Sequence, residues 1–310
     1  GALAIAIKAA NYNHQEFEEV LNSFDFQNLQ VNKPSALPVF QSYEEFIAKE
    51  KRNNPSAIFT FLDQSPKETR INRADSYSGN ILNNIIKFSS EKSLFNGDYL
   101  EEWLYDILAE RGIRTFGDLK NGLVDKRNPH DYKIRMTCVD CTRIKSVTLP
   151  DDLVYYGIDP DKFEVAKAVR ISASIPFAFK PVGIEKDGIK YYLIDGGVFD
   201  NFPYWLIDNS TFPTIGFRIQ SEKQNINLKT PINIIRNIIS TTYDIGIPHH
   251  LKSEINYIEN IPVSNIPTLD FNLTEEAKSY LIESGYEAAY TLFNQIQPQP
   301  FLSFIRRMLG

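Results

Sequence analysis

Residues 191–203 read YYLIDGGVFDNFP, an apolar strand that ends in Asp195, Gly196 and Gly197. A carboxylate at the carboxyl end of a buried strand is where α/β enzymes place reacting groups. The glycines lack Cβ atoms, so the backbone can turn sharply and another segment can approach closely. Asp-Gly-Gly alone is more often a strand-ending turn, and the rest of the chain must decide whether Asp195 is catalytic.

The composition excludes several classes of function. The chain has 310 residues, of which 43% are hydrophobic and 23% charged, as in a soluble globular protein. Its net charge of -6 argues against a nucleic-acid partner, because binding phosphates needs clustered Lys and Arg. No apolar run approaches the length that spans a bilayer. The length fits one α/β domain, residues 1–310.

Helical and strand patterns alternate along the chain, which predicts a mostly parallel sheet covered on both faces. A polar stretch at residues 31–95 interrupts them and is interpreted as an insertion or cap. Asp98 and Thr274 are the expected N-caps of two helices. The expected helices are 1–10, 14–21, 43–51, 81–88, 98–112, 162–169, 232–239 and 274–295, and the expected strands are 132–139, 145–149, 191–194, 213–219 and 255–261.

Cys138 and Cys141 form a C-x-x-C inside a strand-like segment. Residues three apart in a strand point to opposite faces, whereas a redox pair normally opens a helix. A zinc site would need two further ligands nearby. We therefore expect ordinary reduced cysteines, which favour a reducing compartment.

A nucleophile for Asp195 is not obvious within the chain. The histidines are His14, His130, His249 and His250, and none lies in a recognisable catalytic pattern, so a Ser-His-Asp triad is poorly supported. An aspartate can instead take a proton from a serine directly. Such a serine usually lies in G-x-S-x-G, which the chain lacks. The serines nearest to suitable positions lack the flanking glycines of that motif: Ser76, Ser78, Ser172 and Ser174.

At this point the sequence matches a family. It resembles the patatin-like phospholipases, especially their bacterial branch, over nearly its whole length. Each supporting segment is weak singly, but their shared order is specific: residues 1–3, 98–104, 149–153, 168–177, 195–203, 270–274 and 284–286.

The resemblance implies a three-layer α/β/α sandwich with a mostly parallel central sheet and a Ser-Asp dyad that hydrolyses lipid acyl esters. Asp195 matches the family's general base, and Gly196 and Gly197 complete its motif. Gly1 matches the last glycine of G-x-S-x-G, which would put the serine two residues upstream. The family's first strand and glycine-rich oxyanion loop would also precede Gly1. The implied partner is a lipid or phospholipid ester, without cofactor or metal.

Two alternatives stay open at this stage. An acyltransferase could use the same acyl-enzyme, and a chain without a nucleophile could be a lipid-binding or interaction module. The expected location is the cytoplasm, with peripheral membrane contact allowed. The apolar segment 301–309, which holds two arginines, could lie in a membrane interface, but docking onto the protein's own surface is favoured.

Overall fold

The computed structural model describes residues 1–29, 93, 95, 97–126, 128–176, 178–207, 214–221, 256–264, 266 and 273–295. Several predictions fall outside these residues. They concern the helices at 43–51, 81–88 and 232–239, the insertion at 31–95 apart from two of its residues, the segment 301–309, and the side chains of Ser76, Ser78, His249 and His250.

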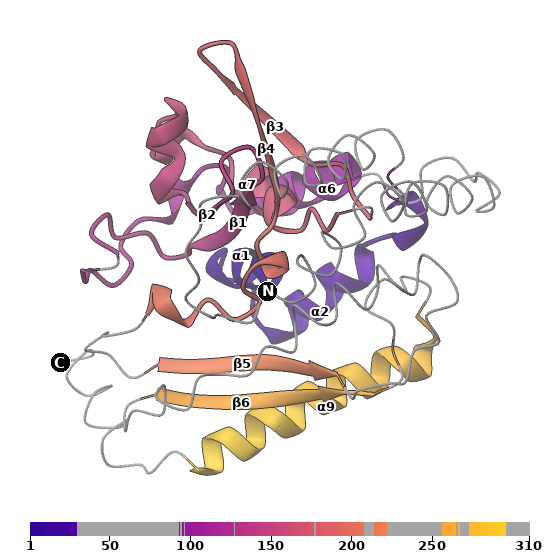
Figure 1. The fold of residues 1–310 in the computed structure, drawn as a ribbon. Coiled ribbons are helices and arrows are strands. Elements are labelled where there is room, and N and C mark those ends of the chain that lie inside the picture. Colours follow the sequence, from indigo (N-terminus) through magenta and orange to yellow (C-terminus); the bar gives the residue numbers. More distant parts are fainter. Residues whose placement is uncertain are drawn as a thin grey trace, which may run out of the picture.

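Five α-helices are described, and Figure 1 shows their arrangement. Their bounds are α1 (Ala2–Ala9), α2 (His14–Ser23), α6 (Gly97–Glu110), α7 (Val165–Ser172) and α9 (Glu275–Gln295). Short 3-10 helices connect them at η1 (Phe26–Leu29), η2 (Phe116–Leu119), η3 (Asp151–Tyr156), η4 (Pro160–Lys162), η5 (Gly196–Val198) and η6 (Tyr204–Leu206).

A four-stranded sheet in the order β2-β1-β4-β3 is antiparallel at every pairing. It consists of β1 (Met136–Asp140), β2 (Lys145–Leu149), β3 (Val182–Lys186) and β4 (Ile189–Asp195). A turn of residues 141–144 joins β1 to β2. Asp187 and Gly188, both at positive φ, join β3 to β4.

The predicted mostly parallel sheet is therefore not what these strands form. Parallel neighbours need a crossover of a dozen or more residues, whereas a two- or four-residue turn makes a hairpin. The only parallel pair of strands in the described part of the chain is β5 (Thr214–Ser221) with β6 (Asn256–Val263). Helix α9 packs against β6 and follows these two strands in Figure 1.

Other element boundaries moved by a few residues. The strand predicted from Tyr132 begins at Met136, because Asn128 bonds both the backbone N–H and the carbonyl of Tyr132 and keeps them out of the ladder. Asp98 lies inside α6 and is not its N-cap, since the helix already begins at Gly97. Thr274 does cap α9, accepting the Ala277 N–H at 3.2 Å.

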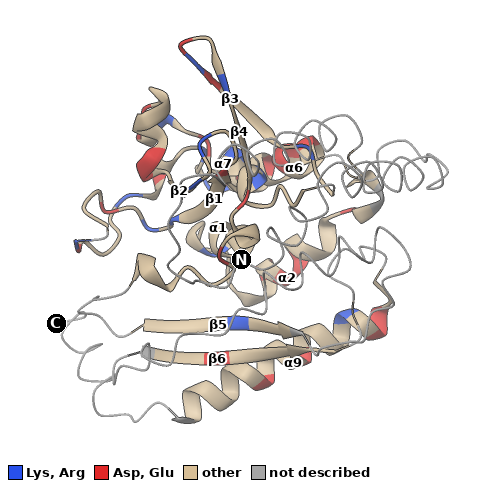
Figure 2. Ribbon diagram, in the orientation of Figure 1, with Lys and Arg blue, Asp and Glu red and all other residues tan. Residues whose placement is uncertain are grey.

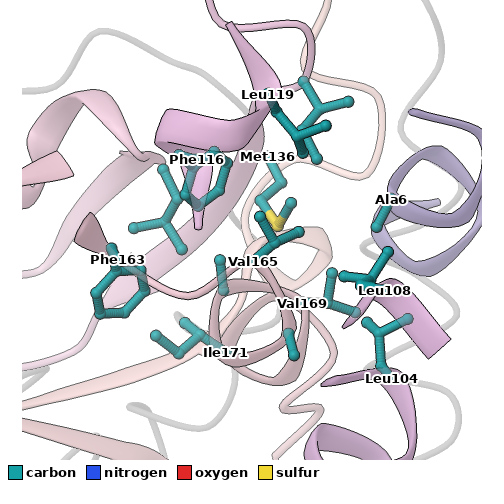
Figure 3. Packing of buried hydrophobic residues seen from close by; sticks show 14 of the residues in the cluster. Ala6, Leu104, Leu108, Phe116, Leu119, Met136, Phe163, Val165, Val169 and Ile171 are labelled. Atoms are coloured by element: carbon teal, nitrogen blue, oxygen red, sulfur yellow. The ribbon is translucent and has the colours of Figure 1, made fainter. Parts of the chain in front are cut away.

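The main hydrophobic core surrounds α7. This helix contacts α1 and α6 as well as strands β1 and β4, so the helices and the sheet share one core. Figure 3 shows Val165, Val169 and Ile171 of α7 among side chains of the other elements. Six of the eight residues of α7 are buried, including Arg170.

Charged residues are dispersed over the described elements. Figure 2 shows Lys and Arg interspersed with Asp and Glu on the elements around the four-stranded sheet. This distribution agrees with the overall net charge of -6.

Candidate active site

Asp195 is the last residue of β4 and caps the short helix η5 that follows it. Its Oδ1 accepts the Gly197 N–H at 2.6 Å, so the carboxylate folds back over the turn. The side chain is buried, with 9% of the residue exposed. The strand thus delivers one fixed carboxylate to the point where the backbone turns.

Gly196 is required by a close approach of strand β1. A Cβ atom at this position would lie 2.4 Å from Thr137 Oγ1 and 2.6 Å from the Thr137 carbonyl oxygen. The same carbonyl accepts a hydrogen bond of 2.9 Å from the Ser172 hydroxyl at the end of α7. The turn after Asp195 therefore packs directly on β1, where any side chain would push the segments apart.

Burial raises the pKa of the Asp195 carboxyl to about 6. The Gly197 N–H and the amino group of Gly1 partly oppose this, because both favour the charged carboxylate. A carboxyl with a pKa near neutrality can accept and return a proton with little cost in either direction. Burial therefore brings proton exchange at Asp195 close to neutral pH.

The start of α1 lies beside Asp195, although 194 positions separate them in the chain. The Gly1 nitrogen and the Asp195 carboxyl lie close enough for an electrostatic interaction. Gly1 is the N-cap of α1, and its carbonyl accepts the Ile5 N–H at 3.0 Å.

The two cysteines lie near the site but do not have the properties of reactive thiols. Cys138 of β1 pairs directly with Asp195 and is fully buried in the main core, while Cys141 belongs to a separate cluster with Val139 and Ile194. The predicted opposite orientation is thus confirmed. Burial raises the pKa of the Cys138 thiol strongly and, together with the Asp140 charge, raises that of Cys141 to about 12. Both thiols remain protonated at neutral pH.

The two serines of the 168–177 segment lie near Asp195 but are engaged elsewhere. The Ser174 carbonyl accepts the Asp195 N–H at 3.0 Å, whereas the Ser174 hydroxyl is fully buried and donates to the Arg170 carbonyl at 2.7 Å. The Ser172 hydroxyl is bonded to Thr137. Neither hydroxyl has the exposed geometry of a nucleophile.

Neither of the two described histidines belongs to the elements that carry Asp195. His14 begins α2, and the His130 ring contacts the Tyr132 ring. Among the residues that the structure describes, no group of three or more His, Cys, Asp or Glu is arranged to hold a metal ion.

Two buried charged residues were missed by sequence reasoning. Asp140 is fully buried at the end of β1, where it accepts hydrogen bonds from the backbone N–H of Thr142 and Arg143 and from the Tyr156 hydroxyl. Arg170 is buried behind Asp195. The signal for Arg170 was available, because the apolar residues of α7 surround it on both sides in the sequence.

About the first two thirds of the chain match a known family. The profile of the patatin-like phospholipases, described as "Patatin-like phospholipase", matches residues 1–207, which include Gly1, α7 and the Asp195 turn. The chain belongs to the patatin-like phospholipase family. The match ends before β5, so the residues that follow η6 lie outside it.

Two relatives of this patatin-like chain carry no described function. It is 36% identical over 199 residues to the uncharacterized protein YqhO of Bacillus subtilis (strain 168), covering 62% of this chain and 64% of that protein. It is 30% identical over 211 residues to the uncharacterized protein R571 of Acanthamoeba polyphaga mimivirus, covering 63% of each. The match spans less than two thirds of the length of these relatives.

Among the described residues, none of the helices combines the length and the apolarity that crossing a bilayer requires.

Proposed function

We propose that the complete protein is a lipid acyl hydrolase that uses a Ser-Asp dyad, with Asp195 as its general base. The observation that carries this proposal is the meeting of the α1 N-terminus with the buried Asp195 carboxyl. Membership of the family, whose members are named as phospholipases, supports a lipid ester as the substrate class.

The position of the nucleophile follows from chain geometry. We place the serine two residues before Gly1, and two residues of extended chain span at most about 7 Å. A serine there must lie within reach of Gly1 and hence near the carboxyl on which the Gly1 charge acts. The turn into α1 would also aim backbone N–H groups and the positive end of the helix at the reacting oxygen.

The proposed reaction needs one proton acceptor and one nucleophile. Asp195 takes the serine hydroxyl proton while the serine oxygen attacks the ester carbonyl, and backbone N–H groups upstream of Gly1 stabilise the oxyanion. The proton then passes to the departing alcohol as the C–O bond breaks. Asp195 next takes a proton from water, which attacks the acyl-enzyme, and passes it to the serine oxygen as the acyl–serine bond breaks and the fatty acid leaves.

The finer fold assignment also remains a proposal. A three-layer sandwich with a mostly parallel sheet would require further parallel strands, and the only parallel pair among the described elements is β5–β6. We expect such strands in the segment that precedes the serine.

A fluorophosphonate probe tests the proposal on the full-length protein. We expect one adduct, on the serine two residues before Gly1, located by peptide mass spectrometry, together with release of fatty acid from a lipid ester. Asp195→Asn should lower kcat by ~10²- to 10⁴-fold. The matched control is Asp200→Asn, because Asp200 follows in the same loop and its carboxylate accepts the Phe202 N–H and the Trp205 indole N–H rather than the Gly197 N–H that Asp195 accepts.

Three results would count against this function. A folded, full-length protein without any adduct would indicate a binding module. Near-normal hydrolysis by Asp195→Asn would remove the aspartate from the mechanism. Transfer of the acyl group to an added alcohol in preference to water would identify an acyltransferase.

A further inference from the structure

The main chain of Asp195 is held by a loop outside the sheet. Its N–H donates to the Ser174 carbonyl at 3.0 Å, in addition to the pairing of β4 with β1. The direction of the Asp195 carboxyl depends on this backbone, because the residue is both the end of a strand and the cap of η5. Whatever fixes Ser174 therefore fixes Asp195.

Arg170 fixes Ser174 from two sides. Its Nη1 donates to the Ser174 hydroxyl at 2.6 Å, and the hydroxyl in turn donates to the Arg170 carbonyl at 2.7 Å. The second guanidinium nitrogen, Nη2, donates to the Lys180 carbonyl at 3.1 Å. The Arg170 side chain thus links the end of α7 to Ser174 and to Lys180, the two residues between which the loop runs.

The guanidinium is packed too closely to move. Arg170 is 3% exposed and lies between the Phe179 ring, at 5.5 Å, and Gly97, the first residue of α6. A Cβ atom at position 97 would be 1.9 Å from the guanidinium carbon. Gly97 therefore leaves the space that the planar group fills.

Burying the Arg170 guanidinium is energetically unfavourable. No ion pair of Arg170 with a carboxylate exists within the described part of the chain, and its Nε has no hydrogen-bond partner there. Burial lowers the pKa of the guanidinium, against the more distant charges of Asp98 and Glu101. Moving a charge out of water is unfavourable when no counter-ion lies close, so packing alone does not explain an arginine at this position.

We propose that Arg170 is a positioning residue for Asp195, acting through Ser174 and the Ser174 carbonyl. The inference rests on the proposed function for its catalytic consequence, but the positioning itself is a property of the fold. Arg170 touches neither substrate nor the reacting atoms. It holds the backbone from which the general base projects.

The test compares Arg170→Met with Arg135→Met in the full-length protein. Arg135 is the matched control, because its side chain is also largely buried, with 15% exposed. Its Nε donates to Asp151 Oδ2 at 2.8 Å, in an ion pair that does not involve Asp195. Hydrogen exchange of the Asp195 amide and steady-state hydrolysis of a lipid ester are measured for both. Arg170→Lys and Ser174→Ala serve as milder variants in case Arg170→Met does not fold.

We expect Arg170→Met to speed exchange of the Asp195 amide by at least ~10-fold and to lower kcat by ~10- to 100-fold with KM within ~3-fold, because small misplacements of a reacting group are costly. Arg170→Lys should recover part of kcat. Arg135→Met should leave both measurements within ~3-fold of the wild type even where its melting temperature falls.

Two results would overturn the inference. The first is that the Asp195 amide exchanges as slowly as in the wild type, either in Arg170→Met or in both milder variants. The other is a loss of kcat that Arg135→Met reproduces at equal loss of stability. If the wild type itself hydrolyses nothing, the proposed function fails, and the amide exchange still decides whether Arg170 positions Asp195.

Discussion

At the scale of single residues, the site depends on the environment of one carboxyl group. Asp195 is buried against β1, and this burial outweighs the Gly197 N–H and the Gly1 charge in setting its pKa near 6. A solvated aspartate would be ionised far below neutrality and would be a weaker base. Burial thus makes the group suited to proton transfer and also costs stability.

The rate of ester hydrolysis should rise with pH through about 6. Asp195 acts as a base only when ionised, so kcat/KM should fall on the acid side with an apparent pKa near this value. In the full-length protein a peptide bond takes the place of the Gly1 amine, so no positive charge opposes the burial and the limb should lie at about 6 or above. A pH–rate profile of the full-length protein checks this. A limb centred near 4 would contradict the burial argument.

The stability of the protein should carry the opposite dependence. The folded-state pKa of Asp195 lies above its value of 3.8 in an unfolded chain, so the folded state binds the proton more tightly. This contribution is full below pH 3.8 and is lost as the pH rises to 6. At pH 8, Asp195→Asn should raise the free energy of unfolding by about 1 to 3 kcal/mol. Urea unfolding at pH 8 measures it, and a clear destabilisation would contradict the argument.

At the scale of elements, the contact between η5 and β1 holds the aspartate in its turn. The sequence predicted the strand, the aspartate and the need for glycines there. It could not predict that Thr137 is the residue against which Gly196 packs, because that contact depends on the register of two strands far apart in the chain. The sequence pattern predicted a mostly parallel sheet, whereas the four strands β1–β4 pair antiparallel, because turns of four and two residues make hairpins of β1–β2 and β3–β4.

Glycine-to-alanine substitutions at two positions should have opposite effects. Gly196→Ala forces a methyl group into Thr137 and should lower the free energy of unfolding by about 2 to 3 kcal/mol, with loss of hydrolysis. Gly285→Ala lies inside α9 with no atom within 4 Å of the new methyl, and should raise it by about 0.5 to 1 kcal/mol. Thermal melts of the two variants provide the comparison. Equal destabilisation would show that Gly196 has no special role.

At the scale of the whole molecule, the described residues form two assemblies of different size. The large core surrounds α7. Ala288 and Leu292 are buried outside the three main clusters, on α9, which packs against β6 of the β5–β6 pair. The outer side of α9 exposes Ile282, Tyr286 and Tyr290. Sequence periodicity predicted the helix and its cap, but a helix that is apolar on two sides does not reveal which side is buried.

Neighbouring residues of α9 should separate these two sides. Leu292→Ala should lower stability by about 2 to 4 kcal/mol, because Leu292 is 1% exposed, while Phe293→Ala should change it by less than about 0.5 kcal/mol. Hydrogen exchange should quicken in β5 and β6 of Leu292→Ala and remain slow in β1 and β4. Uniform quickening across both sheets would indicate a single cooperative unit.

The reactivity of the two cysteines can be used to measure how often the sheet opens. They are the only thiols in the sequence, both are buried, and both are kept protonated by their surroundings. Alkylating reagents should therefore react with Cys138 only when β1 separates from its neighbours, and with Cys141 only when the turn after β1 opens. The rate of thiol modification then reports how often the sheet beside Asp195 opens, without any added label, and a single cysteine introduced elsewhere on the surface would be modified alone.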